Sequence, residues 1–90
     1  MKIEVSRNFD RTYRKLSNDL QREVDETTTL FVEYYASRQF PKSLRVHKCS
    51  RFLSLSVSMN YRVFVLPIKD GIKFIFLGDH NDAVQFLKNI

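Results

Sequence analysis

The hydrophobic and polar positions at the start of the chain predict a short strand followed by two helices. Residues 2–6 alternate polar with β-branched side chains, which is typical of an edge strand. From Asn8, a candidate N-cap, apolar side chains recur at helical spacing. Polar residues then interrupt this spacing, and Asn18 with Gln21 has the form of a capping box for a second helix. We therefore expect a helical hairpin.

After Pro41, which disfavours helical geometry in the residue before it, the pattern changes to a period of two. In one segment leucine, valine and methionine alternate with Ser54, Ser56 and Ser58, so this strand should have one buried and one polar face. The chain closes with a candidate helical turn over residues 82–87. Four β-type runs separated by very short connections predict an antiparallel meander: 44–49, 52–59, 61–68 and 72–77.

The length and composition indicate one globular domain over residues 1–90. With 90 residues, 43% of them hydrophobic, the chain is too short for two domains and too apolar to stay disordered. No apolar run approaches the roughly 18 residues that a membrane-spanning helix needs, and the first seven residues lack a signal-peptide pattern. The single cysteine, Cys49, excludes an internal disulfide. We expect a cytoplasmic protein that does not contact a membrane.

The positive charge is concentrated in the β-rich half of the chain. The formal net charge is +5, yet the segment from Tyr34 through Lys69 holds seven basic residues, Lys69 included, and no acidic one. Exposed cations can serve solubility alone, but the complete absence of acids favours a face that binds a polyanion. The candidate phosphate-binding cations in this segment are Lys42, Arg45, Lys48 and Arg51.

Three side chains are candidates for chemistry on a bound phosphate. His47 and His80 are the only side chains whose ordinary pKa suits proton transfer near neutrality, although either could be merely structural or exposed. Arg62 interrupts an otherwise apolar strand, where a guanidinium needs either a carboxylate or an anionic ligand. The two readings are a salt bridge to Asp79 or Asp82 and a clamp on a phosphate.

These three residues would allow RNA cleavage without a metal or another cofactor. One histidine would remove the proton of a ribose 2′-hydroxyl, and that oxygen would attack the adjacent phosphate. The other histidine would protonate the departing 5′-oxygen, leaving a cyclic phosphate and a free 5′-hydroxyl. DNA lacks the 2′-hydroxyl and would not react. Asp79 and Asp82 alone are a weak metal signal, so we expect no metal site.

Four segments follow a short strand and a helical hairpin in a fixed order and spacing: His47–Lys48, Leu53–Val57, Asn60–Val63 and Gly78–Asp82. In this arrangement nearly the whole chain resembles the RelE/ParE superfamily of bacterial toxins from toxin-antitoxin systems. The resemblance implies an α+β fold in which an N-terminal strand and helical hairpin pack on a twisted, mainly antiparallel sheet of four to five strands, followed by a short C-terminal helix.

The resemblance also implies roles for individual residues. Arg62 matches the strand arginine that contacts the scissile phosphate, and His47 and His80 match two histidines of the YafQ-like branch. The sequence departs from the family pattern elsewhere. Ser54 and Ser56 replace sheet lysines of RelE, and a third catalytic histidine of the YafQ-like branch also falls near Ser56. The usual terminal aromatic position holds Val84 and Gln85, and the nearby Phe86 is out of register.

The resemblance therefore implies three alternative functions. The first is a ribosome-dependent mRNA endoribonuclease that enters the ribosomal A site and inhibits translation. The second is a ParE-like inhibitor of DNA gyrase. The third, which the missing terminal aromatic makes reasonable, is a catalytically inactive member that binds a partner helix between the helical hairpin and the sheet. For either toxin type the resemblance implies a cognate antitoxin that wraps the toxin and forms a hetero-oligomer with it. RNA contacts are expected from the four cations with Ser54 and Ser56, and supporting roles from Asp82 and Phe86.

Overall fold

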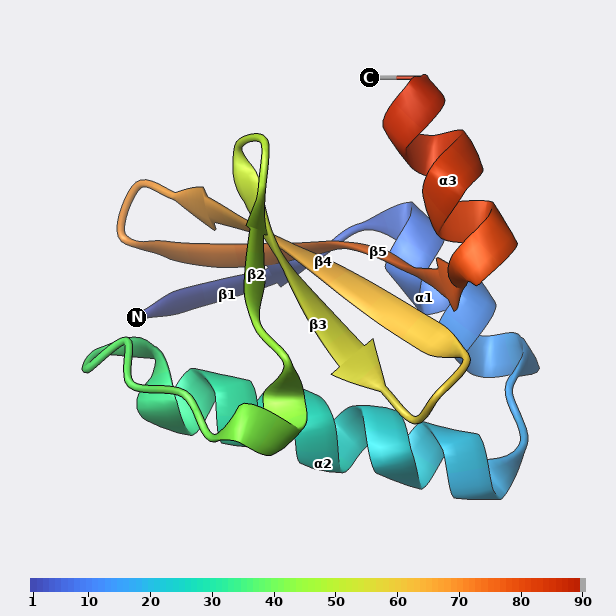
Figure 1. The fold of residues 1–90 in the computed structure, drawn as a ribbon, viewed down its shortest axis with the longest axis horizontal. Helices are drawn as coiled ribbons and strands as arrows, with labels where there is room; N and C mark the ends of the chain where they lie inside the picture. The colour runs from blue at the N-terminus through green and yellow to red at the C-terminus, as the bar shows by residue number, and fades with distance from the viewer. Residues whose placement is uncertain (90) are drawn as a thin grey trace.

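The computed structural model describes residues 1–89 and shows an α+β fold in which helices cover a five-stranded sheet (Figure 1). This confirms the expected fold class. The elements in chain order are β1 (Lys2–Val5), α1 (Arg7–Lys15), α2 (Asn18–Tyr35), the 3₁₀ turn η1 (Lys42–Leu44), β2 (His47–Cys49), β3 (Phe52–Val57), β4 (Tyr61–Ile68), β5 (Gly71–Asp79) and α3 (His80–Lys88).

The sheet has the strand order β1-β5-β4-β3-β2. Strands β2 to β5 form the expected antiparallel meander, and β1 is the expected edge strand, paired in parallel with β5. In a parallel pair the two strands need a crossover connection, which the helical hairpin and the meander together provide. The turn between β4 and β5 places Asp70 at a φ of 67°, a left-handed conformation that aspartate tolerates.

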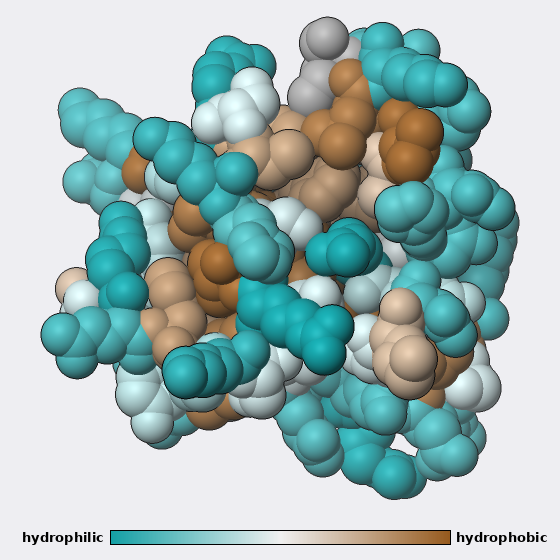
Figure 2. Space-filling view, viewed as in Figure 1, coloured by the Kyte–Doolittle hydropathy of each residue, from teal (hydrophilic) through white to brown (hydrophobic). Residues whose placement is uncertain are grey.

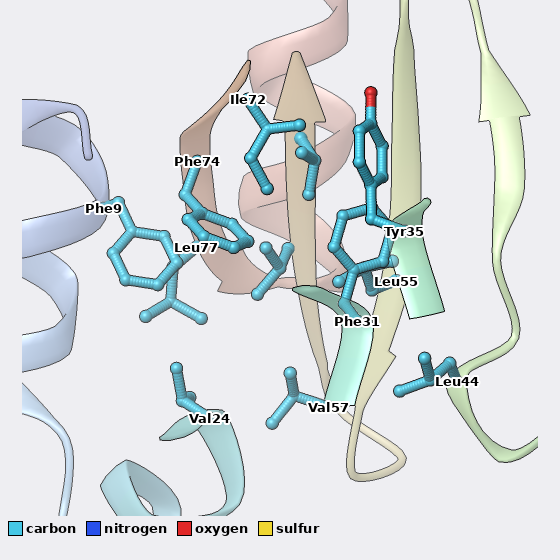
Figure 3. Packing of buried hydrophobic residues seen from close by; sticks show 12 residues of the cluster. Phe9, Val24, Phe31, Tyr35, Leu44, Leu55, Val57, Ile72, Phe74 and Leu77 are labelled. Carbon is cyan, nitrogen blue, oxygen red and sulfur yellow. The ribbon is translucent and has the colours of Figure 1, made fainter. Parts of the chain in front are cut away.

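Hydrophobic side chains cover both faces of the sheet. On one face Phe9 of α1 and Phe31 of α2 pack on strand residues that include Phe74, with ring centroids 5.6 and 6.4 Å from that of Phe74 (Figure 3). On the other face a smaller cluster under α3 holds Ala83 and the aromatic rings Phe52, Phe64 and Phe76. Because successive strand residues point to opposite faces, the residues between the core positions face α3.

The helix starts differ from the expected caps. The N-cap of α1 is Ser6, whose hydroxyl accepts from the Phe9 N–H and donates to the carbonyl of Ile75 in β5. The N-cap of α2 is Ser17. Asn8 and Asn18 are therefore wrong as caps. The sequence pattern could not show the bond from Ser6 to β5, because it joins residues 69 positions apart.

Several β boundaries also move. The predicted run 44–49 is a strand only over His47–Cys49, because Leu44 ends a 3₁₀ turn and Arg45 is left-handed with a φ of 47°. The run 52–59 ends at Val57, because Ser58 has a φ of 57°. The predicted terminal turn is a full helix, α3. Among residues 1–89, no helix is both long and apolar enough to cross a membrane.

Candidate functional site

Arg62 lies in the middle of a polar row on the sheet face that carries α3. Within β4 its neighbours Tyr61 and Val63 contribute to the α1/α2 core, so strand alternation turns Arg62 to the opposite side. Its cross-strand partners are Ser56 on β3 and Gly78 on β5. The half-buried guanidinium donates from Nη1 to the Ser56 hydroxyl at 3.4 Å.

No carboxylate neutralises Arg62 within residues 1–89. The three ion pairs found there belong to Lys2, Arg14 and Arg22. Asp79 and Asp82 instead form the capping box of α3: the Asp82 N–H donates to Asp79 Oδ1 at 2.8 Å, and the Asp79 N–H donates to Asp82 Oδ2 at 3.3 Å. The salt-bridge reading of Arg62 is therefore wrong, and the guanidinium is free to bind an external anion.

The two histidines lie on either side of Arg62. His47 on β2 pairs with Ser54, so it is on the same sheet face as Ser56 and Arg62. His80 is the first residue of α3 and comes two positions after Gly78, the partner of Arg62. Both imidazoles are exposed. Because β3 and β4 separate β2 from β5, a strand spacing near 4.8 Å gives about 14 Å between the two histidine backbones in the direction across the strands. They are also offset along the strands, because His47 is level with Phe64 whereas His80 lies beyond Gly78, on the other side of Arg62.

The two serines of the predicted RNA-binding set differ in accessibility. Ser54 is only 6% exposed, whereas Ser56 is partly exposed beside Arg62. Ser54 could contact RNA only if the side chains covering it moved. Ser56 therefore presents the accessible hydroxyl of this pair.

Phe86 and Asp82 help to hold α3 in its position on the sheet. The Phe86 ring packs on Phe52, Phe64 and Phe76, with centroid separations of 6.4, 5.8 and 5.0 Å. This aromatic contact holds α3 against the sheet. Asp82 caps the start of the same helix, where His80 lies. Both residues are thus placed to fix the position of His80.

The predicted cations lie in three different places. Lys42 and Arg45 line a groove with His47, together with Arg38, Phe40, Pro41 and Val46. Lys48 pairs with Leu53, which faces the α1/α2 core, so Lys48 lies on the other side of β2. Arg51 is exposed in the turn between β2 and β3. Figure 2 shows hydrophilic side chains over most of the face on view, with hydrophobic surface gathered near α3.

Sequence reasoning counted Arg38 as basic but did not place it in the site, and it missed Phe40. The sequence shows a cation, Arg38, and an aromatic residue, Phe40, within the three positions before Pro41. Only the fold brings both side chains into one groove with His47.

A second groove lies where a partner-binding groove was expected, between α2 and the sheet. It has a volume of about 290 Å³, and its walls include Glu23 and Glu26 from α2 and Ser56 and Ser58 from the β3 end. Its charge is opposite to that of the groove beside His47. The described surface thus has an acidic side on α2 and a basic side around β2.

No protein-family model matches the chain, and no curated protein sequence matches it. Solved structures do. YafQ from E. coli superposes with a TM-score of 0.71 at 13% sequence identity, covering 91% of this chain and 96% of YafQ. RelE in the RelB-RelE antitoxin-toxin complex from Methanococcus jannaschii gives 0.67 at 13% identity, with 92% and 96% covered. YafQ from the E. coli DinJ-YafQ complex gives 0.70 at 13% identity, with 90% and 94% covered.

These likenesses define the architecture of the chain. It is a small α+β protein with an open mixed sheet and a C-terminal helix. More particularly, it has the RelE-like toxin fold that YafQ and RelE share.

Proposed function

We propose that this protein is the toxin of a type II toxin-antitoxin system and acts as a ribosome-dependent, metal-independent mRNA endoribonuclease. The observation that carries the proposal is Arg62: a half-buried guanidinium in a central strand that has no carboxylate partner among residues 1–89. Such a charge is costly to leave without a counterion, and a scissile phosphate supplies one. The RelE-like toxin fold supports the same reading.

The chemistry begins at the ribose next to the scissile phosphate. One histidine takes the proton of the 2′-hydroxyl as the oxygen attacks phosphorus. Negative charge then increases on the phosphate oxygens, where Arg62 stabilises it more strongly than in the ground state. The P–O5′ bond breaks, and the second histidine gives its proton to the leaving oxygen. The products are a 2′,3′-cyclic phosphate and a 5′-hydroxyl.

The placement of the two histidines suits this reaction. The attacking and leaving oxygens lie on opposite sides of the phosphorus, so a base and an acid are needed on opposite sides. His47 and His80 flank Arg62 across the sheet in this way. An RNA strand over the α3 side of the sheet would place one phosphate at Arg62 and Ser56.

The proposed partners are the ribosome with its mRNA and an antitoxin. YafQ and RelE have been solved with the antitoxins DinJ and RelB. We expect the antitoxin of this chain to cover its basic face. The expected complex is a toxin-antitoxin hetero-oligomer.

The test is cleavage of a defined mRNA in a reconstituted bacterial translation system, read by primer extension. The wild-type chain should cut the transcript only when ribosomes are present. Arg62→Ala should lower the cleavage rate by about 10²- to 10³-fold, the usual loss when one donor to a developing oxyanion is removed. Lys69→Ala, which removes an equal charge from the exposed β4–β5 turn, should cut normally.

Three outcomes would contradict the proposal. A folded Arg62→Ala protein with full activity would exclude the phosphate clamp. An intact transcript, with gyrase inhibited in a supercoiling assay, would indicate the ParE-like function. The absence of both effects, with no growth arrest at high expression, would identify a catalytically inactive interaction protein.

A further inference from the structure

The groove beside His47 combines an apolar floor with a basic rim. It has a volume of about 450 Å³ and lies between the end of α2 and the start of β2. Phe40, Pro41 and Val46 supply apolar surface, and four side chains that carry or can acquire positive charge surround it: Arg38, Lys42, Arg45 and His47. No acidic residue lines the groove, and no ion pair within residues 1–89 involves any of these cations.

The aromatic part of the floor is held rigidly in place. The Phe40 ring stacks on Phe31 with centroids 4.9 Å apart and planes 3° from parallel. Phe31 is fully buried in the main core, whereas Phe40 is only partly buried. The core therefore fixes one side of the Phe40 ring, and the remaining surface contributes to the groove. A fixed aromatic surface beside cations is how proteins bind single-stranded nucleic acid.

Two of the arginines are held in backbone conformations that arginine rarely adopts. Arg38 has a φ of 59° after the end of α2, and Arg45 has a φ of 47° after the 3₁₀ turn. Glycine or asparagine is the usual residue where a helix ends in this way. The Arg38 guanidinium also lies 3.6 Å from the centre of the Tyr35 ring and donates to the Tyr35 carbonyl. Strained residues of this kind concentrate at functional sites.

We propose that this groove is a binding site for one or two nucleotides of single-stranded RNA, with a base stacked at Phe40 and the flanking phosphates held by Arg38, Lys42 and Arg45. This inference rests on the proposed function for the identity of the polymer as RNA. His47 lies both in the groove and on the face that carries Arg62. The groove therefore extends the path of the strand beyond the scissile phosphate, across β2.

The contacts in the groove involve base faces and phosphates, which RNA and DNA share. The groove should therefore also bind a 2′-deoxy oligonucleotide, which 2′-hydroxyl attack cannot cleave. A duplex, whose bases are already stacked, should bind much more weakly. These properties allow binding to be measured separately from catalysis.

The experiment is fluorescence anisotropy of a labelled 12-nucleotide deoxyadenosine strand at several salt concentrations. The double variant Arg38→Gly/Arg45→Gly removes two cations while introducing the residue that their backbone conformation favours. This variant should have the melting temperature of the wild type or a higher one, and it should bind the strand more weakly. The slope of log K against log salt should fall by about 1.4, because each of the two lost phosphate contacts to a single strand contributes about 0.7. Phe40→Leu should weaken binding about tenfold or more through the loss of stacking.

The matched control is Lys15→Gln/Lys69→Gln, which removes two exposed charges from α1 and from the β4–β5 turn. It should retain most of the affinity. A wild-type chain that does not bind the strand would overturn the inference, as would a folded glycine double variant with unchanged affinity and salt slope. Binding that depends on the groove without mRNA cleavage would support this site and contradict the ribonuclease. If the groove variants cleave mRNA at the wild-type rate and bind the strand with unchanged affinity, the ribonuclease proposal is supported and the groove site is contradicted.

Discussion

Arg62 is the residue on which the proposed function depends most directly. Its position in an apolar run was enough to mark it as either ion-paired or ligand-binding. The choice between the two depended on Asp79 and Asp82, and these carboxylates bond to backbone amides of α3. An aspartate next to the start of a helix can cap that helix instead of pairing with a cation. The position of Asp79 and Asp82 directly after β5 therefore did not imply a salt bridge to Arg62.

The lack of a side chain at Gly78, the cross-strand partner of Arg62, is what allows α3 to start beside the site. A Cβ at Gly78 would lie 2.6 Å from Cζ of Phe76 and 2.9 Å from Cβ of Asp82. Any larger residue would therefore push α3 away from β5 at the point where His80 begins the helix. The absence of a side chain there lets the helix start close to Arg62.

Also at the scale of single residues, mutation should show whether each histidine contributes to the cleavage rate. His80→Ala and His47→Ala should each lower the single-turnover rate of mRNA cleavage by about 10²- to 10⁴-fold, the range for loss of a general acid or base. Both side chains are exposed, so unfolding curves should stay close to those of the wild type. If one variant cleaves at the wild-type rate, that histidine is not part of the proton transfer.

At the scale of elements, the N-terminal cap of α3 is predicted to couple stability to activity. Asp79→Ala removes the capping carboxylate and should lower the free energy of unfolding by about 1 kcal/mol. Because His80 follows directly, cleavage should fall as well. Asp79→Asn can still accept the Asp82 N–H and should behave almost as the wild type in chemical denaturation and in cleavage. If Asp79→Ala and Asp79→Asn lose the same stability and activity, the negative charge of Asp79 is responsible and not its hydrogen bond to the Asp82 N–H.

The contact between α1 and α2 should make stability depend on pH in the alkaline range. The Tyr13 hydroxyl donates to both oxygens of Asp25, at 2.8 and 3.0 Å. This hydrogen bond, then desolvation and the negative charge of Asp25, raises the pKa of Tyr13 above its usual value of about 10. The unfolded chain therefore ionises first, and the stabilisation is complete below pH 10 and lost as the pH rises through the folded-state pKa.

Tyr13→Phe should accordingly be less stable than the wild type at pH 8, and the difference should shrink above pH 10. Urea unfolding at a series of pH values measures this difference. Tyr34→Phe is the matched control, because Tyr34 is exposed on α2 and its hydroxyl makes no hydrogen bond within residues 1–89. A gap between Tyr13→Phe and the wild type that stays constant with pH would contradict the role of the hydroxyl.

At the scale of the whole molecule, the two oppositely charged sides predict how an antitoxin would neutralise the protein. A segment that covers the cations around β2 must bring acidic side chains. If a short reading frame for an antitoxin lies adjacent to its gene, co-expression of the two should relieve growth arrest, and the two chains should elute together in gel filtration. Their association should weaken as salt increases. Continued growth arrest, with the two chains eluting separately, would contradict the prediction that the co-expressed chain is the antitoxin.

The sequence alone was sufficient for properties that are encoded over a few neighbouring residues. The change from helical to alternating period predicted the hairpin and the meander, the acid-free segment predicted the basic side, and Arg62 stood out in its strand. Each of these depends on local spacing or on composition. The cap positions were misassigned although the bonds that define them are local, from the Phe9 N–H to Ser6 and from the Leu20 N–H to Ser17. Serine and asparagine are both common N-caps, so residue type alone did not choose between neighbouring candidates.

The tertiary structure decided which side chains have partners. Strand register placed Ser56 against Arg62, buried Ser54, and set His47 and His80 on either side of the site. The packing of Phe40 on Phe31 and the left-handed arginines created the groove beside β2. These outcomes depend on which elements the chain brings together. A single sequence shows which groups need a partner, and only the folded chain shows which of them have none within the described residues.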